Sequence, residues 1–325
     1  MTNGSFWTTL AAVLVTGLLS ILGNQLLERF KVLASRANDE LKARRDYEYE
    51  ARKRLYVETE PILFQFYENA AYVINRILNL ARASRDGSLE GSQSWWRDQY
   101  YLLSAVHGFL APLAAFHILR QRITLLDLTL DDSLERQYEL GKAANRVWSR
   151  DISLASSLYE LRYNPNRQDV EKQSLAPDEE SMYRRQGVLS GYVQRAAAAL
   201  VFTNDGEQRV RSFSEFADAY ENNELTVQRD VEPVLKVLDG FVPARHPVLW
   251  RVIVAQLFVY RAIRLYRERE LTNIQLLERV RLSEVELRDF SFSLAREDQE
   301  RVHEAYAVGL QFLAQSLEAR GRFSA

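Results

Sequence analysis

The chain has 325 residues, and its 42 lysine and arginine residues against 44 acidic residues give a formal net charge of −2. Hydrophobic residues make up 47% and charged residues 26%, close to globular averages, which excludes a wholly disordered chain and a polytopic membrane protein. Cysteine is absent, which excludes disulfides, zinc–thiolate sites and a cysteine nucleophile. The near-neutral charge argues against nucleic acid as a partner held by overall electrostatic attraction.

The N-terminal residues 1–27 carry no charged side chain. A helix that spans a bilayer needs about 20 mostly apolar residues, and residues 5 to about 25 fit that length. The stretch therefore predicts a single transmembrane anchor. A cleaved secretory signal and a buried core helix are the alternatives, although a signal would need basic residues ahead of its apolar run. The side chains expected to contact lipid are Phe6, Trp7, Leu10, Val13, Leu14, Leu18, Leu19, Ile21 and Leu22.

Charges on either side of this stretch predict its orientation. No lysine or arginine precedes it, whereas Arg29, Lys31 and Arg36 follow it closely. The positive-inside bias therefore places the N-terminus outside and the body in the cytoplasm, at the inner (plasma) membrane. Only six of the basic residues are lysine and 36 are arginine, a skew typical of GC-rich bacterial genomes.

Residues 28–60 are expected to form a charged helical stalk. They lack glycine, and acids precede bases at i,i+4 spacing, as in Glu40–Arg44, which favours a helix. An apolar ladder resembles a coiled-coil seam, but it covers only two heptads before charged residues replace it. Oligomerisation through this seam and packing of the stalk on its own body both remain open. The ladder consists of Leu27, Phe30, Ala34, Ala37 and Leu41, followed by Arg44 and Glu48.

Residues 61–325 are expected to form an all-α, multi-helix cytoplasmic bundle. Thr59-Glu60-Pro61 predicts a helix restart, because threonine suits a cap and proline a first turn. The uncharged residues 99–119 are interpreted as two buried helices meeting near Pro112, with a second membrane span as the alternative. Further helices are predicted at about 61–84, 133–150, 151–162, 178–202, 212–222, 229–240, 246–269 and 296–319.

Two connecting segments stand out between these helices. Residues 163–180 are polar, contain two prolines and lack apolar periodicity, which predicts an internal boundary or a loop on one face. Residues 200–213 fit either a hairpin around Asp205-Gly206 or an ordinary loop between helices.

The motifs of several enzyme classes are missing. The chain contains no G-x-x-x-x-G-K-[ST], no G-x-G-x-x-G, no H-E-x-x-H and no G-x-S-x-G. Its four histidines and its adjacent acidic pairs lack the spacing that would place metal ligands on one helix face. We therefore expect neither a metal nor another cofactor.

Arg296 and His303 fit the spacing R-x(4–6)-H, which resembles the signature of the HEPN helical nucleases. The resemblance implies a metal-independent ribonuclease in which histidine acts as the acid/base and arginine holds the phosphate, in a site between two protomers. Seven residues on a continuous helix place both side chains near one face, about 10 Å apart along its axis. These two residues are the candidate catalytic pair.

The leading functional hypothesis is a non-enzymatic, membrane-anchored α-helical interaction or effector protein. It would act in bacterial defence or stress response by binding a protein partner or by forming homo-oligomers. Its architecture is similar to that of membrane-tethered effectors of bacterial anti-phage systems, an analogy at the level of architecture alone. The alternatives are the tethered HEPN-like ribonuclease and a receptor whose apolar pocket near residues 99–119 binds a small molecule or lipid.

Overall fold

The computed structural model describes the backbone of residues 3–90, 94–124, 127–150, 186–243, 246–268, 271–290 and 296–318. Side chains are described from Arg29 onward within those ranges, apart from residues 32, 34, 37, 247, 267–268, 287–289 and 296–304. The chain divides into two compact units, Met1–Arg54 and Leu55–Ala325. The second unit is called the body below.

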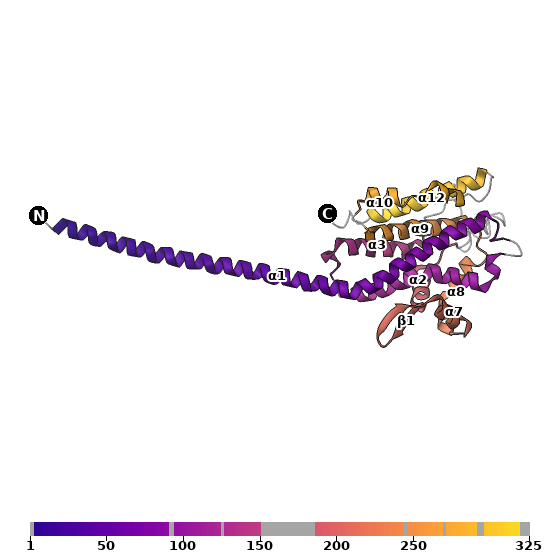
Figure 1. Cartoon of the computed structure of the whole chain (residues 1–325), viewed down its shortest axis with the longest axis horizontal. Coiled ribbons are helices and arrows are strands. Elements are labelled where there is room, and N and C mark those ends of the chain that lie inside the picture. The colour runs from indigo at the N-terminus through magenta and orange to yellow at the C-terminus, as the bar shows by residue number, and fades with distance from the viewer. Residues whose placement is uncertain are drawn as a thin grey trace, which may run out of the picture. The chain divides into compact units, whose positions relative to one another are not determined.

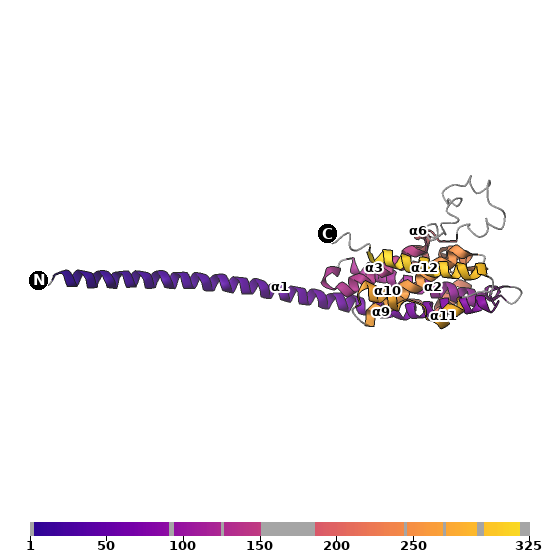
Figure 2. The same cartoon turned by 90° about the horizontal axis from the view of Figure 1, so that it is seen from above.

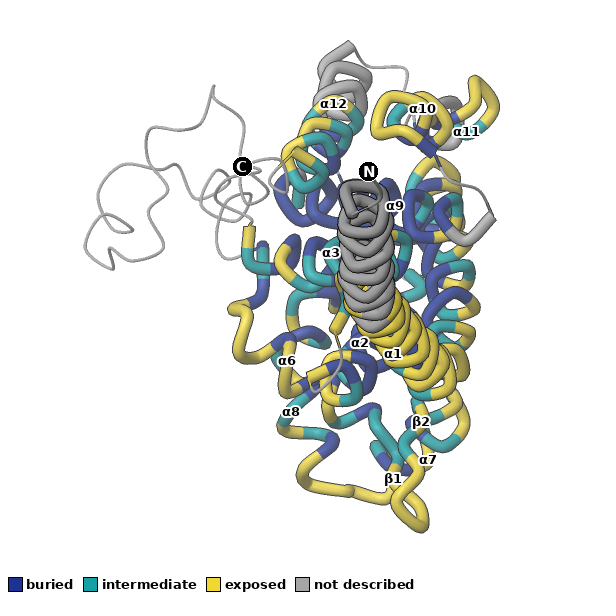
Figure 3. The backbone as a smooth tube through the Cα atoms, turned by 90° about the vertical axis from the view of Figure 1, so that its left-hand side faces the viewer, coloured by how far each residue is buried: buried dark blue, intermediate teal, exposed yellow. Residues whose placement is uncertain are grey.

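Helix α1, Asn3–Arg85, runs through both units without interruption (Figure 1). Among residues 3–54 it is the only element, and the side chains described there are nearly all exposed, as the yellow part of its tube shows (Figure 3). The predicted anchor falls on a helical backbone, but its side chains lie outside the described residues. Anchor and stalk therefore stay predictions.

The predicted helix restart at Thr59-Glu60-Pro61 is wrong, because α1 continues through Pro61. The Thr59 hydroxyl donates to the Leu55 carbonyl oxygen at 2.8 Å, one turn back, instead of capping a new helix. Pro61 has no N–H for the carbonyl of Val57, but Val57 is 67% exposed, so water can supply the missing donor.

Helix α2, Gln99–Ile123, is the centre of the body. Among the described residues it is the one helix long and apolar enough to cross a membrane, and 94% of its most apolar window is buried. It is a single helix, so the prediction of two helices meeting near Pro112 is wrong, although the prediction of a buried core segment holds. Two 3-10 turns flank it, η1 (Trp95–Arg97) and η2 (Leu128–Leu130).

The other helices pack around α2 in layers (Figures 1 and 2). On one side α9 packs on α3 and α12 packs on α9; on the other side α6, α8 and α7 contact α2. Short helices α10 and α11 follow α9 and were not predicted. The bounds are α3 Asp132–Val147, α6 Ser190–Ala199, α7 Phe213–Glu221, α8 Leu225–Leu238, α9 Pro247–Glu268, α10 Asn273–Arg279, α11 Glu284–Asp289 and α12 Arg296–Glu318.

A two-stranded hairpin interrupts this all-helical pattern. Strands β1 (Val201–Asn204) and β2 (Glu207–Val210) pair antiparallel, with Asn204 opposite Glu207. Asp205 and Gly206 form the turn with φ of 49° and 83°, the two positive values that a type I′ hairpin turn requires. Of the two interpretations of residues 200–213, the hairpin is therefore the right one. Residues 151–185, which include the predicted helix 151–162 and loop 163–180, lie outside the described residues.

Candidate functional site

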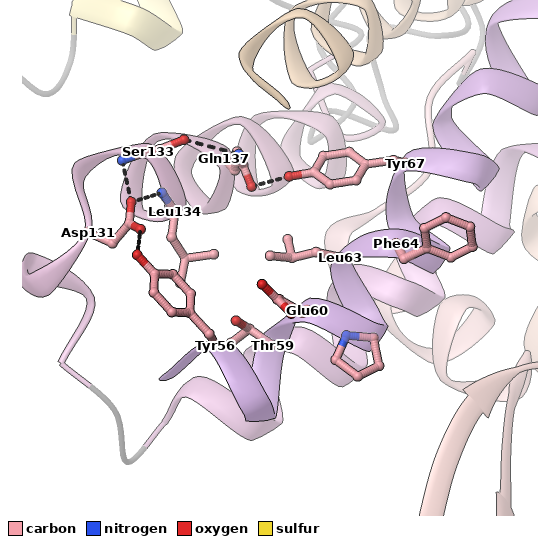
Figure 4. A pocket seen from close by; sticks show the side chains of 11 residues that line it. Tyr56, Thr59, Glu60, Leu63, Phe64, Tyr67, Asp131, Ser133, Leu134 and Gln137 are labelled. Carbon is pink, nitrogen blue, oxygen red and sulfur yellow. Dashed lines mark hydrogen bonds between the residues drawn. The ribbon is translucent and has the colours of Figure 1, made fainter. Parts of the chain in front are cut away.

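A pocket of about 580 Å³ lies in the body between α1 and the start of α3 (Figure 4). Its volume falls within the range of about 300–1,000 Å³ that is usual for small-molecule sites. Seven lining residues come from α1 and four from the start of α3 and the residue before it. They are Tyr56, Thr59, Glu60, Pro61, Leu63, Phe64 and Tyr67, with Asp131, Ser133, Leu134 and Gln137.

The α1 side of the pocket follows from helix geometry. Tyr56, Glu60, Leu63 and Tyr67 recur at spacings of four, three and four, so they share one face of the helix. Such a stripe usually packs into a core, but here Tyr56 is 41% exposed and Glu60 is also exposed. The stripe therefore lines a cavity that opens to solvent.

Two tyrosine hydroxyls bridge α1 to the start of α3. The Tyr56 hydroxyl donates to Asp131 Oδ2 at 2.7 Å, and the Tyr67 hydroxyl donates to Gln137 Oε1. The two tyrosines are eleven residues apart, about 16 Å along the helix axis. Figure 4 shows Glu60 and Leu63 projecting from α1 between the two bridges. The bridges therefore hold the helices together at both ends, while the shorter side chains between them leave the pocket open.

Asp131 also caps α3. Its Oδ1 accepts the backbone N–H groups of Ser133 at 2.8 Å and Leu134 at 3.0 Å. A carboxylate at this position accepts hydrogen bonds from N–H groups of the first turn that have no partner within the helix. Its negative charge also interacts favourably with the positive end of the helix dipole. The helix N-terminus at the pocket is therefore already occupied by an anionic group of the protein itself.

The pocket lining presents carboxylates and aromatic rings. Glu60 and Asp131 are its ionisable acids, and no lysine, arginine or histidine is among the lining residues. Asp131 has the partners given above, whereas Glu60 has no hydrogen-bond or ion-pair partner in the described part of the chain. The rings of Tyr56, Phe64 and Tyr67 supply the apolar surface, and Phe64 is 55% exposed at the rim.

The sequence did not reveal this pocket. The α1 residues of the lining were not singled out from the sequence as a site, and their hydrogen-bond partners at the start of α3 lie 70 to 75 positions further along the chain. The stretch at residues 99–119, proposed from sequence as a receptor pocket, contributes no residue to the lining.

The predicted catalytic pair lies on one helix. Arg296 and His303 both fall in α12, as expected, but their side chains lie outside the described residues. The structure therefore does not test whether they face each other, and the ribonuclease interpretation stays a prediction. No group of three or more potential metal ligands occurs among the described residues.

Two further histidines lie on α2. His107 is buried, and its Nε2 donates to the Arg211 carbonyl oxygen at 2.9 Å, beside the rings of Phe213 and Phe216. Burial lowers the pKa of His107, and the bond to Arg211 opposes that shift in part. Burial also lowers the pKa of His117, with a contribution from the charge of Arg120. Neither histidine lines the pocket.

Neither a protein-family model nor a curated protein nor a solved structure matches this chain. Any functional argument therefore depends on the residues themselves.

Proposed function

We propose that the protein is a membrane-anchored α-helical interaction protein that assembles through a parallel pairing of its stalk. Residues 1–27 supply the anchor, the stalk brings two copies together, and the body carries the binding surfaces. The observation that supports the proposal best is a row of exposed apolar side chains directly after the uncharged stretch, on the same helix.

The exposed row lies on the predicted coiled-coil seam and next to it. Phe30 is 70% exposed, Leu33 61% and Leu41 53%. Large apolar side chains at regular helical spacing and open to water favour association, since burying them removes apolar surface from solvent. No other element lies within residues 3–54 to cover them. A second copy of the same helix is the occupant that the spacing fits.

Charge favours a parallel arrangement of the two copies. With Leu27, Ala34 and Leu41 at heptad position a, Glu40 falls at g and Arg45 at the following e position. In a parallel pair, g of one helix faces the next e of its partner, so two Glu40–Arg45 ion pairs would form. A shared membrane anchor also requires the copies to run in the same direction.

The seam ends where the charged residues begin. Arg44 Nε contacts Glu48 Oε1 of the same helix at 3.1 Å, so these residues pair within one chain. The assembly would then be short and reversible, as expected of a protein that responds to a partner. The same proposal places the protein in bacterial defence or stress response.

Fractionation tests the anchor. The full-length chain should remain with membranes in high salt and in alkaline carbonate, and an alkaline phosphatase fused after Ala325 should be inactive in the cytoplasm. Recovery of the full-length chain mainly as a soluble protein would overturn the anchor and remove one argument for a parallel direction, whereas the pairing itself has a separate test.

Cysteine cross-linking tests the pairing, because the native chain has no cysteine to interfere. In native membranes, Ala37→Cys at the seam should give a disulfide-linked dimer under mild oxidation. Arg36→Cys, one residue off the seam, is the matched control and should stay largely monomeric. Equal cross-linking of both variants, or of neither, would reject the pairing.

A further inference from the structure

The pocket between α1 and α3 has a lining that selects for one ligand chemistry. We propose that it binds an alkylammonium cation through the carboxylate of Glu60, with aromatic rings of α1 around the charge. This inference does not depend on the membrane anchor or on the pairing of the stalk.

The hydrogen-bonding groups of the pocket favour a ligand that donates. The hydroxyls of Tyr56, Tyr67 and Thr59 already donate to partners within the chain. The helix-terminal N–H groups that could have held an anion donate to Asp131. The hydrogen-bonding atoms that remain for a ligand in the cavity are mainly acceptors, above all the two carboxylate oxygens of Glu60.

Charge excludes an anion and favours a cation. The lining contains two carboxylates and no basic side chain. Asp131 is compensated by the first turn of α3, so Glu60 carries the charge that a ligand would balance. A phosphate or carboxylate ligand would meet repulsion here and would find no basic side chain in the lining.

The remaining walls favour an organic cation over a metal ion. Hard divalent cations need about six oxygen ligands, whereas tyrosine and phenylalanine rings, Leu63 and Leu134 take up much of this lining. Aromatic faces attract organic ammonium groups, and the leucines suit an alkyl chain. A primary ammonium fits best, because its N–H groups can donate to Glu60.

Two sources offer this chemistry, a free alkyl diamine and a lysine side chain of a peptide. Both present a primary ammonium on a chain of four or five carbons, and the volume of about 580 Å³ accommodates either. Cadaverine and Nα-acetyl-lysine methylamide serve as the two probes. Binding of one or both supports the site and shows which source it prefers.

The test uses calorimetry on the full-length chain in detergent. Cadaverine or the lysine derivative should bind, and Glu60→Gln should weaken that binding at least tenfold, because it removes the charge and keeps the shape. Glu60 is exposed and unpaired in the described part of the chain, so the variant should fold. Glu68→Gln, an exposed acid two turns further along α1 and outside the lining, should bind like the native chain.

Three results would overturn the proposal. One is the absence of binding by either amine at millimolar concentration. The second is equal binding by the Glu60→Gln variant. The third is binding of 1-pentanol or inorganic phosphate as tightly as the amines, which would mark an apolar or an anion site. Phe64→Leu separates the aromatic contribution and should weaken amine binding several-fold while the affinity for 1-pentanol stays the same.

Discussion

Residues 1–27 and residues 99–119 are two uncharged, mostly apolar stretches of similar length, and the second also contains His107, Pro112 and His117. The second stretch lies in α2, where the surrounding helices bury it and its polar groups find partners. His107 bonds to a backbone carbonyl, and Ser104 Oγ lies 3.1 Å from the Tyr72 hydroxyl. The first stretch shares its unit with no element except its own helix. An apolar run thus becomes a core helix when the rest of the chain supplies both cover and hydrogen-bond partners.

The largest expected effect comes from placing a charge in each stretch. Ala114 of α2 is fully buried, so Ala114→Asp should destabilise the body by more than about 3 kcal/mol, since the new carboxylate has no partner. Leu14→Arg should leave the body folded and reduce the membrane-bound fraction, because arginine at the centre of a membrane helix costs about 2.5–3.5 kcal/mol. Thermal unfolding followed by circular dichroism, together with fractionation, measures both.

The opposite pattern would contradict this difference between the two stretches. If Leu14→Arg unfolds the body, the first stretch packs as a core helix. If Ala114→Asp leaves the stability of the body unchanged, α2 does not lie in the core at Ala114.

A smaller effect tests how tightly α2 is enclosed. A Cβ atom added at Gly141 of α3 would lie 2.4 Å from the ring of Phe116, which is buried in α2. Such overpacking costs about 1–3 kcal/mol, so Gly141→Ala should lower the free energy of unfolding by that amount. Gly191 of α6 has nothing within 4 Å of the same added atom. Gly191→Ala is therefore the control and should leave stability unchanged or slightly raised; equal losses would indicate a general intolerance of substitution.

Much of the helical framework could be predicted from apolar periodicity. Helices α3, α8 and α9 overlap the predicted ranges, because each buries a stripe at helical spacing, as Leu134, Leu140 and Val147 do in α3. The Asp205-Gly206 dipeptide left a hairpin and an ordinary loop equally open, and the structure decides for the hairpin. These features depend on local sequence, which one chain displays in full.

The predictions failed where contacts between residues far apart in the sequence decide the structure. Pro61 and Pro112 sit inside continuous helices, because the packing of α1 and α2 outweighs the lost backbone hydrogen bonds. The pocket depends on pairs such as Tyr56–Asp131, and no local pattern shows which residue 75 positions away a tyrosine will meet. Sequence thus predicted the elements better than the site between them.

The smallest expected effect concerns the polar residue that distinguishes α2 from the first stretch. The unfolded chain binds a proton at His107 near pH 6.5, whereas burial lowers its pKa in the folded body. Below about pH 6.5 the unfolded state therefore binds more protons, and stability should fall as the pH falls toward the folded pKa. The slope from one histidine cannot exceed about 1.4 kcal/mol per pH unit.

His107→Gln keeps a donor for the Arg211 carbonyl and should flatten this slope between pH 6.5 and 5. His117→Gln tests the other α2 histidine with a lowered pKa, and since its ring is only half-buried, its share should be smaller. Denaturant unfolding across this pH range measures both variants, and an unchanged slope in His107→Gln would show that the ring titrates in solvent rather than in the core.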